Sequence, residues 1–200
     1  MKMLFSFLLL LVPISIFAQT DKIYDSLNAQ VVSIKARTPV NSNNHAVINI
    51  IQALSDETLQ SDAGELSEGT RATYQKMLSD PTTTNWHLLY LYQAYSENVI
   101  QPTPNPKFQQ ACIKLLFEEF IDTYDAAPAV ILIYAGETLI TQNTAAAAEH
   151  FKKALVHYPK SIPLMVYRWQ LISEGQEKKQ LYAKLKKDHP NHWMVKMMVK

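Results

Sequence analysis

The strongest constraint on the fold of this chain is a recurring pair of residues. An aromatic residue is followed eight positions later by a proline, and the pair occurs three times with an offset of 31 residues. The three pairs are Phe120 and Pro128, Phe151 and Pro159, and Tyr182 and Pro190. A fixed period in this range is typical of stacked helical hairpins, each of which buries its apolar face against the next.

The residues between these prolines favour helices. The whole chain has only four glycines, and Ala, Leu, Lys, Gln and Glu, all good helix formers, are frequent in its second half. Apolar residues recur at helical spacing in segments separated by turn residues. The helices expected here span 86–98, 107–124, 129–141, 144–158, 160–173, 176–188 and 191–200. The sequence therefore predicts an all-α fold.

The first 18 residues have the pattern of a secretory signal peptide. A charged start at Lys2 precedes an apolar stretch from Leu4 to Phe17, and Ala18 is a small residue at a plausible cleavage site. The alternative is an uncleaved anchor helix, but the stretch is short and Pro13 interrupts it. We therefore expect an exported protein, periplasmic or secreted, without a transmembrane segment in the mature chain.

Residues 19–81 form a second region, which shows no repeat. A helix is expected from near Thr20 or Asp21 through Ile34, and another over 47–54. A polar loop is expected at 55–68, with a short turn of helix as an alternative within it, followed by a weaker helix through Tyr74 and Leu78. The repeat region then covers 82–200. Terminal units of a helical stack often diverge to cover its ends, which is the role that we expect for 19–81.

Charge and cysteine content limit the classes of partner. Removal of residues 1–18 takes away Lys2 and leaves 18 basic against 18 acidic residues. A neutral chain argues against nucleic acid as the main ligand and against an electrostatic membrane-surface role. Short lysine-rich pieces such as Lys184 to Lys187 are interpreted as solvated helix faces. Cys112 has no partner for a disulfide within the chain, and we expect it to be a small buried side chain.

The segment from Pro128 to Pro159 resembles a tetratricopeptide repeat. The second helix of that family's hairpin has an A-x3-F pattern followed by a proline, which Ala147, Phe151, Ala154 and Pro159 match. The resemblance covers about residues 84–200. Two departures are the period of 31 instead of 34 and the missing glycine–tyrosine signature of the first helix. The resemblance implies a short right-handed α-solenoid of hairpins; the alternative is an irregular helical bundle.

The resemblance also implies where a ligand would bind. In such stacks the first helices of successive hairpins line a concave groove for peptides or partner proteins. Transferred in register, the groove residues are His87, Leu91, Leu132, Gly136, Leu139, Tyr167 and Gln170. The groove would suit an extended or helical protein segment. The N-terminal helices could instead cover Leu132 and Leu139 and make them core residues.

No catalytic motif occurs in the sequence. There is no G-x-S-x-G, no glycine-rich phosphate loop and no H-E-x-x-H. His189 and His192 are the one pair at metal-like spacing, but they flank Pro190 and are interpreted as residues of a turn. We expect no enzyme, no cofactor and no metal.

The function expected from the sequence is therefore an exported, non-catalytic interaction adaptor for a protein or peptide of unknown identity. A second hypothesis is an envelope protein that binds a carbohydrate or another small ligand. The aromatic residues that favour it are Trp86, Tyr90, Tyr92, Tyr95, Trp169 and Trp193. Aromatic residues at helical spacing are more often part of a core, which favours the first hypothesis.

Overall fold

The computed structural model describes residues 11–198, with side chains from Asp21 onward. Ten α-helices and one π-helical turn make up the regular structure of this part of the chain, and no strand occurs in it. The predicted all-α fold is confirmed.

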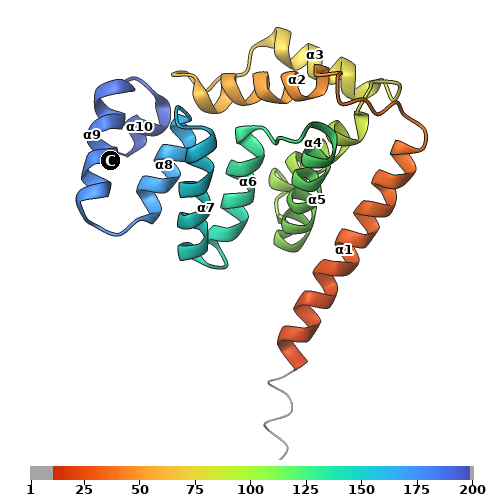
Figure 1. Cartoon of the computed structure of the whole chain (residues 1–200), viewed down its shortest axis with the longest axis horizontal. Coiled ribbons are helices and arrows are strands. Elements are labelled where there is room, and N and C mark those ends of the chain that lie inside the picture. Colours follow the sequence, from red (N-terminus) through yellow and green to blue (C-terminus); the bar gives the residue numbers. More distant parts are fainter. Residues whose placement is uncertain (1–10, 199–200) are drawn as a thin grey trace, which may run out of the picture.

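Most of the helices form one array. Each of the helices from α4 to α9 packs against the next, and α10 packs on α8 (Figure 1). Their bounds are α4 Trp86–Val99, α5 Pro106–Tyr124, α6 Ala129–Ile140, α7 Thr144–His157, α8 Ile162–Leu171, α9 Gln176–Asp188 and α10 Trp193–Met197. These bounds agree with the sequence periodicity to within a few residues; α10 begins two residues later than predicted, and residues 199–200 of the predicted helix lie outside the described residues.

The recurring aromatic–proline pairs mark three of the links between these helices. Each recurring aromatic residue lies in α5, α7 or α9, and the proline that follows it lies in the link to the next helix. Polar side chains cap several helices of the array: the side chain of Asn143 accepts a hydrogen bond from the backbone N–H of Ala146 at the start of α7 at 3.0 Å, and that of Ser161 accepts one from Leu164 at the start of α8 at 3.5 Å. Such caps supply partners for N–H groups that the first turn of a helix leaves unpaired.

The first helix, α1 (Leu11–Lys35), begins about ten residues earlier than the start expected near Thr20 or Asp21. It lies along one end of the array against α5 and α4, and buries Leu27, Val31 and Ile34 there (Figure 1). The predicted signal peptide falls partly on residues 1–10, which lie outside the described residues. The α1 backbone runs without interruption through residue 18, and cleavage there stays a prediction.

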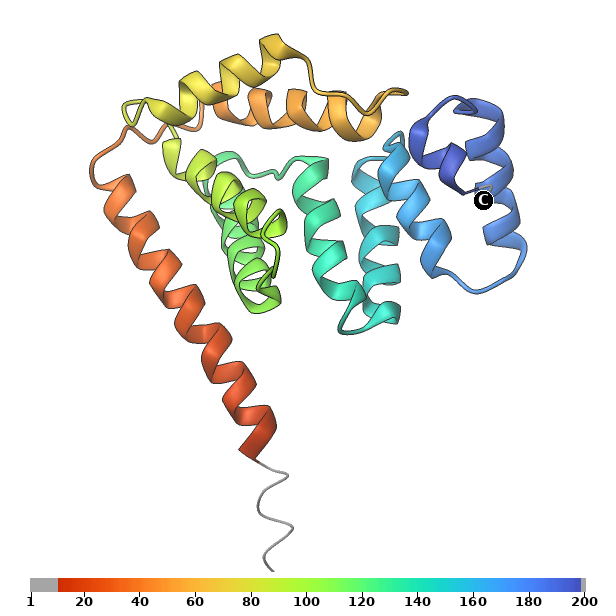
Figure 2. The ribbon, with the colours of Figure 1, turned by 180° about the vertical axis from the view of Figure 1, so that it is seen from behind.

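A second layer crosses the ends of the array. Helices α2 (Ala46–Ser55) and α3 (Glu68–Ser79) lie across α4 and α6, with the π-helical turn η1 (Asp56–Gln60) between them (Figures 1 and 2). The predicted loop at 55–68 is therefore helical at its start, and α3 begins earlier than Tyr74. The Glu57 carboxylate accepts hydrogen bonds from the Ser67 backbone N–H at 2.7 Å and from the Thr70 hydroxyl at 2.6 Å, which fixes the start of α3.

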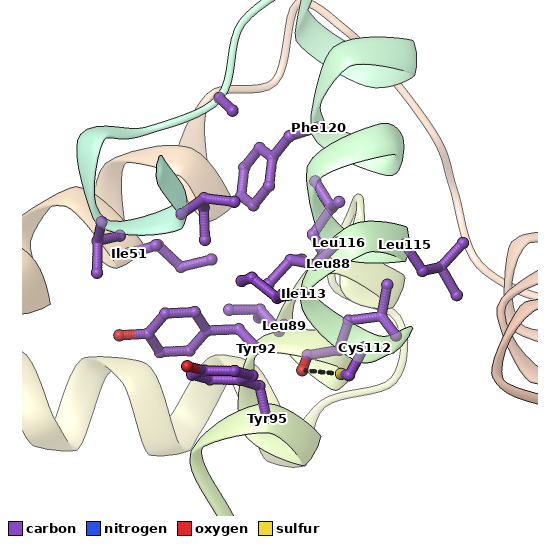
Figure 3. Close-up of a cluster of buried hydrophobic side chains, with 14 of the residues drawn as sticks. Ile51, Leu88, Leu89, Tyr92, Tyr95, Cys112, Ile113, Leu115, Leu116 and Phe120 are labelled. Carbon is purple, nitrogen blue, oxygen red and sulfur yellow. Dashed lines mark hydrogen bonds between the residues drawn. The ribbon is translucent and has the colours of Figure 1, made fainter. Parts of the chain in front are cut away.

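The apolar side chains of the described residues gather in three clusters along the array. The largest joins α1, α2, α4, α5 and the start of α6, with Phe120, Leu88 and Ile51 fully buried (Figure 3). A second joins α6, α7 and α8 around Phe151, and a third joins α8, α9 and α10 around Leu185. The core is thus a continuous row of contacts between neighbouring helices, in which each helix depends mainly on the next.

Candidate functional site

The seven residues predicted to line a groove do not share one open surface. His87 and Leu91 of α4 are fully buried, Gly136 of α6 is buried, and Gln170 of α8 is exposed. The remaining three, Leu132, Leu139 and Tyr167, are half-buried and pack against the cluster around Phe151. Most of the predicted positions therefore contribute to the core, and the structure brings only part of the set together.

A layer of tyrosines fills the face where the groove was expected. The rings of Tyr95 and Tyr134 stack with centroids 4.8 Å apart, and Tyr92 lies 6.2 Å from Tyr134. The Tyr167 hydroxyl donates a hydrogen bond to the carboxylate of Glu137, which lies on the same face. Burial raises the pKa of Glu137, although this hydrogen bond acts in the opposite direction. The layer is packed too closely to receive a peptide between its rings.

The four residues that carry the resemblance lie in α7 and in the link that follows it. Ala147, Phe151 and Ala154 are buried, whereas Pro159 lies exposed in the link to α8. The Phe151 ring stacks on Tyr167 of α8 with centroids 5.0 Å apart and planes 6° from parallel. Phe151 therefore joins one helix pair to the next.

A buried polar cluster holds α1 to the array. Glu119 of α5 accepts a hydrogen bond from Lys35 of α1 at 2.8 Å, and the fully buried His87 lies 3.3 Å away on its other side. Burial by itself would raise the pKa of Glu119, but His87 and Lys35 together outweigh it and lower that pKa. The cluster connects α1, α4 and α5 through charged and polar side chains.

A groove of about 340 Å³ lies where η1 meets the link from α7 to α8. The Gln60 side chain spans one end of it: its amide donates to the Lys160 carbonyl at 3.0 Å, and its oxygen accepts from the Ile162 backbone N–H at 3.0 Å. These two bonds connect the crossing layer to the array. The groove is therefore closed at that end by a structural contact.

A second groove, of about 320 Å³, lies over α8 between α7 and α9. Leu155 of α7 and Leu181 of α9 are half-buried and provide its apolar surface, while Lys152 and Lys184 extend from the two walls. Arg168 of α8 lies in the same groove. We call this the α7–α9 groove.

Hydrogen bonds hold Arg168 in place in the α7–α9 groove. Its Nη1 donates to the Ala148 carbonyl at 2.8 Å, and its Nε and Nη2 donate to Glu177 of α9 at 3.0 and 2.8 Å. The guanidinium of Arg168 thereby connects α8 to both α7 and α9, the two helices that form the walls of the groove. The two lysines have no hydrogen bond or ion pair with any residue that the structure describes.

The neutral charge of the chain conceals a strong division between its two parts. Residues 144–200 contain eleven basic and four acidic residues, a net charge of +7, and residues 19–143 contain seven basic and fourteen acidic residues, a net charge of −7. The α7–α9 groove lies in the basic part. The net charge of the whole chain does not reveal this division, and from the sequence Lys184 is interpreted only as part of a solvated helix face. The net charge of each segment does reveal it, and we call residues 144–200 the basic lobe.

The described residues contain no group of three or more His, Cys, Asp or Glu side chains placed to hold a metal ion. His192 is buried; its Nε2 lies 2.9 Å from the Leu59 carbonyl, and its Nδ1 accepts from the Met194 backbone N–H at 3.3 Å. Cys112 is buried as predicted, and its thiol donates to the Leu91 carbonyl (Figure 3). No helix in the described part of the chain has the length and apolar content to span a membrane.

Comparison of the chain with protein-family models, with characterised proteins and with solved structures finds no match.

Proposed function

We propose that the chain is an exported, non-catalytic adaptor that binds a segment of a partner protein in the α7–α9 groove. The array would act as a short tetratricopeptide-like solenoid. The observation that carries the proposal is the groove itself, which combines an apolar surface with two lysines that no described residue pairs. Apolar contacts give such a recess affinity for a protein segment, and charges at its edge select and orient that segment.

The position of the groove differs from the one that the family resemblance implies. Tyrosine rings occupy the face formed by α4, α6 and α8, whereas the α7–α9 groove lies between two second helices of successive hairpins. The proposed binding surface therefore comes from the geometry of this chain and is not transferred from the family.

Site-specific photo-crosslinking in cells that produce the protein tests this function. A photoreactive residue at Gln180, which lines the α7–α9 groove, should form an adduct with a partner. The same group at Gln75, an exposed position of α3, is the control and should not form that adduct. Recovery of the adduct from the envelope fraction would support export, and equal labelling from both positions would contradict the assignment of the groove.

A second candidate function, binding of a carbohydrate, is favoured by one surface. A groove of about 510 Å³ between α1 and α4 has Trp86 and Tyr90 on one side, with rings stacked at 5.8 Å, and polar side chains such as Gln30 and Arg37 on the other. Aromatic faces beside hydrogen-bonding groups suit sugar rings. Titration with glycans that changes the fluorescence of the wild type but not of Trp86→Phe would favour this function over the first.

A further inference from the structure

We infer that the α7–α9 groove binds an acidic protein segment that inserts an apolar side chain between its two walls. The inference rests on the proposed function and specifies the chemistry of the partner. Three observations carry it: the two unpaired lysines, the apolar surface between them, and the excess of positive charge in this part of the chain.

The first observation is the placement of the lysines on opposite walls. On α7, Lys152 and Leu155 are three residues apart, and on α9, Leu181 and Lys184 are three residues apart, so each wall presents one leucine and one lysine on the same helix face. A ligand that contacts both leucines therefore passes between two ammonium groups. Carboxylates on either side of an apolar anchor would match this arrangement.

The second observation concerns the acidic residues near the groove. Glu177 is the one carboxylate that lines it, and this residue is bonded to Arg168. Glu174, nearby in the chain, pairs with Lys178 at 3.0 Å. Glu149 and Asp188 lie one helical turn from Lys152 and Lys184 on the same helices, but neither lysine forms an ion pair with a described carboxylate. An incoming anionic group would therefore meet two unpaired ammonium groups.

The third observation is the electrostatic field of residues 144–200 as a whole. A net charge of +7 over residues 144–200 attracts anionic segments and repels cationic ones. Because the rest of the mature chain is acidic, an acidic partner is directed toward this lobe and away from the remainder of the molecule. The charge division therefore favours both the sign of the ligand and the place where it binds.

The shape of the groove favours a protein segment over an anionic membrane. Leu155 and Leu181, the apolar surface of the groove, are half-buried between α7 and α9, so a single inserted side chain contacts them more fully than a flat lipid surface would. A recess of about 320 Å³ suits one anchoring side chain and its neighbours.

Selection from a random peptide library of about twelve residues, displayed on phage and panned against the whole protein, tests the inference. We expect the selected peptides to be rich in Asp and Glu around one large apolar residue. Binding of a synthetic copy should weaken about tenfold or more in Lys152→Glu/Lys184→Glu, because like charges then face each other. It should also weaken as salt is raised.

Matched variants separate the groove from the general charge of the lobe. Lys153→Glu/Lys179→Glu makes the same change in net charge at exposed positions on other faces of α7 and α9, and binding should weaken less than about threefold. Lys152→Gln/Lys184→Gln removes the charges without reversing them and should also weaken binding. Circular dichroism and a urea titration establish that each variant is folded.

Each other outcome overturns the inference in a distinguishable way. Neutral or basic peptides, or equal losses in the two charge-reversed variants, would contradict the acidic segment and leave the adaptor function standing. Failure to select any peptide would contradict both proposals. Vesicles with an anionic phospholipid that bind the wild type but not Lys152→Glu/Lys184→Glu, in the absence of a peptide ligand, would assign the lysines to a membrane surface.

Discussion

At the scale of single residues, close contacts around Phe151 connect the helices of the array. This ring is fully buried between Gly136 of α6 and Tyr167 of α8. A glycine inside a helix usually costs stability, because it gains the most conformational freedom on unfolding. Because Gly136 has no side chain, the Phe151 ring of α7 can lie directly against the backbone of α6 at this position.

Gly136→Ala should therefore destabilise the protein. A Cβ at this position would lie 2.5 Å from Cε1 and 2.8 Å from Cε2 of Phe151, and the ring has no free space because Tyr167 stacks on its face. We expect a loss of about 1–3 kcal/mol in the free energy of unfolding, measured by urea titration.

Gly69→Ala is the matched control for this substitution. Gly69 lies in α3, and a Cβ added there meets no atom within 4 Å. Because Gly69 lies in the first turn of α3, the free energy of unfolding should rise by no more than about 0.5 kcal/mol, in the direction expected for the better helix former. If both variants were destabilised equally, the close contact at Gly136 would not be the cause.

A second prediction at this scale concerns His192. Burial lowers the pKa of His192, although the carbonyl of Leu59 and the charge of Asp62 oppose the shift. The unfolded chain therefore takes up a proton at a higher pH than the folded chain does. Stability should be complete above the ordinary histidine pKa of 6.5 and should fall as the pH is lowered from there through the folded pKa.

His192→Asn tests this dependence. Asparagine can accept the hydrogen bond from Met194 that Nδ1 accepts in the wild type, and it does not titrate. The urea midpoint of the variant should change less between pH 7 and 5 than that of the wild type. The wild-type loss is limited to about 1.4 kcal/mol for each unit by which the pKa is lowered. Identical profiles would show that other groups cause the loss.

At the scale of the elements, α1 depends on one face for its attachment. Leu27, Val31 and Ile34 are buried against the array, and Lys35 bonds to Glu119. All of these residues follow position 19, the expected start of the mature chain. Cleavage before Gln19 would therefore retain these contacts between α1 and the array.

A chain beginning at Gln19 should accordingly unfold at the same urea concentration as the full chain. A chain beginning at Val40 should lose at least about 4 kcal/mol, since burial of each of the three apolar side chains contributes about 1.5–3 kcal/mol. Leu27→Ser in the Gln19 chain serves as the intermediate case. Equal stability of the two shortened chains would show that α1 does not stabilise the array.

The sequence predicted the elements better than it predicted the site. Prolines and regular apolar spacing mark α4 to α9 because local residues determine where these helices begin and end. For the loop at 55–68 the sequence indicates at most a short turn of helix; it does not place the π-helical turn at 56–60, whose Gln60 contacts the distant link from α7 to α8. The expected groove rests on aligning the chain with the repeat positions of the tetratricopeptide family. Such an alignment does not reveal that tyrosines from α4, α6 and α8 pack over the face where the groove is expected.

At the scale of the whole molecule, stability should be uneven along the array. The largest cluster unites five helices, whereas the cluster around Leu185 joins only α8, α9 and α10. Within α9, all of whose residues are described, Leu185 alone is buried. Parts of a protein with few buried contacts open at a lower free energy than the global unfolding. The wall of the α7–α9 groove formed by α9 is thus the part that we expect to open first.

Hydrogen exchange measured by mass spectrometry tests this order. The free energy of opening measured for the amides of α9 should be at least about 2 kcal/mol lower than that measured for the amides of α5. Leu185→Ala should speed exchange in α9 and leave α5 unchanged, because Leu185 contacts the α8–α10 cluster and not the larger one. An equal acceleration in α5 would show that the array unfolds as one cooperative unit. If an acidic segment binds between α7 and α9, it should slow exchange in α9 most strongly, since its binding energy then adds to the contacts that hold this helix closed.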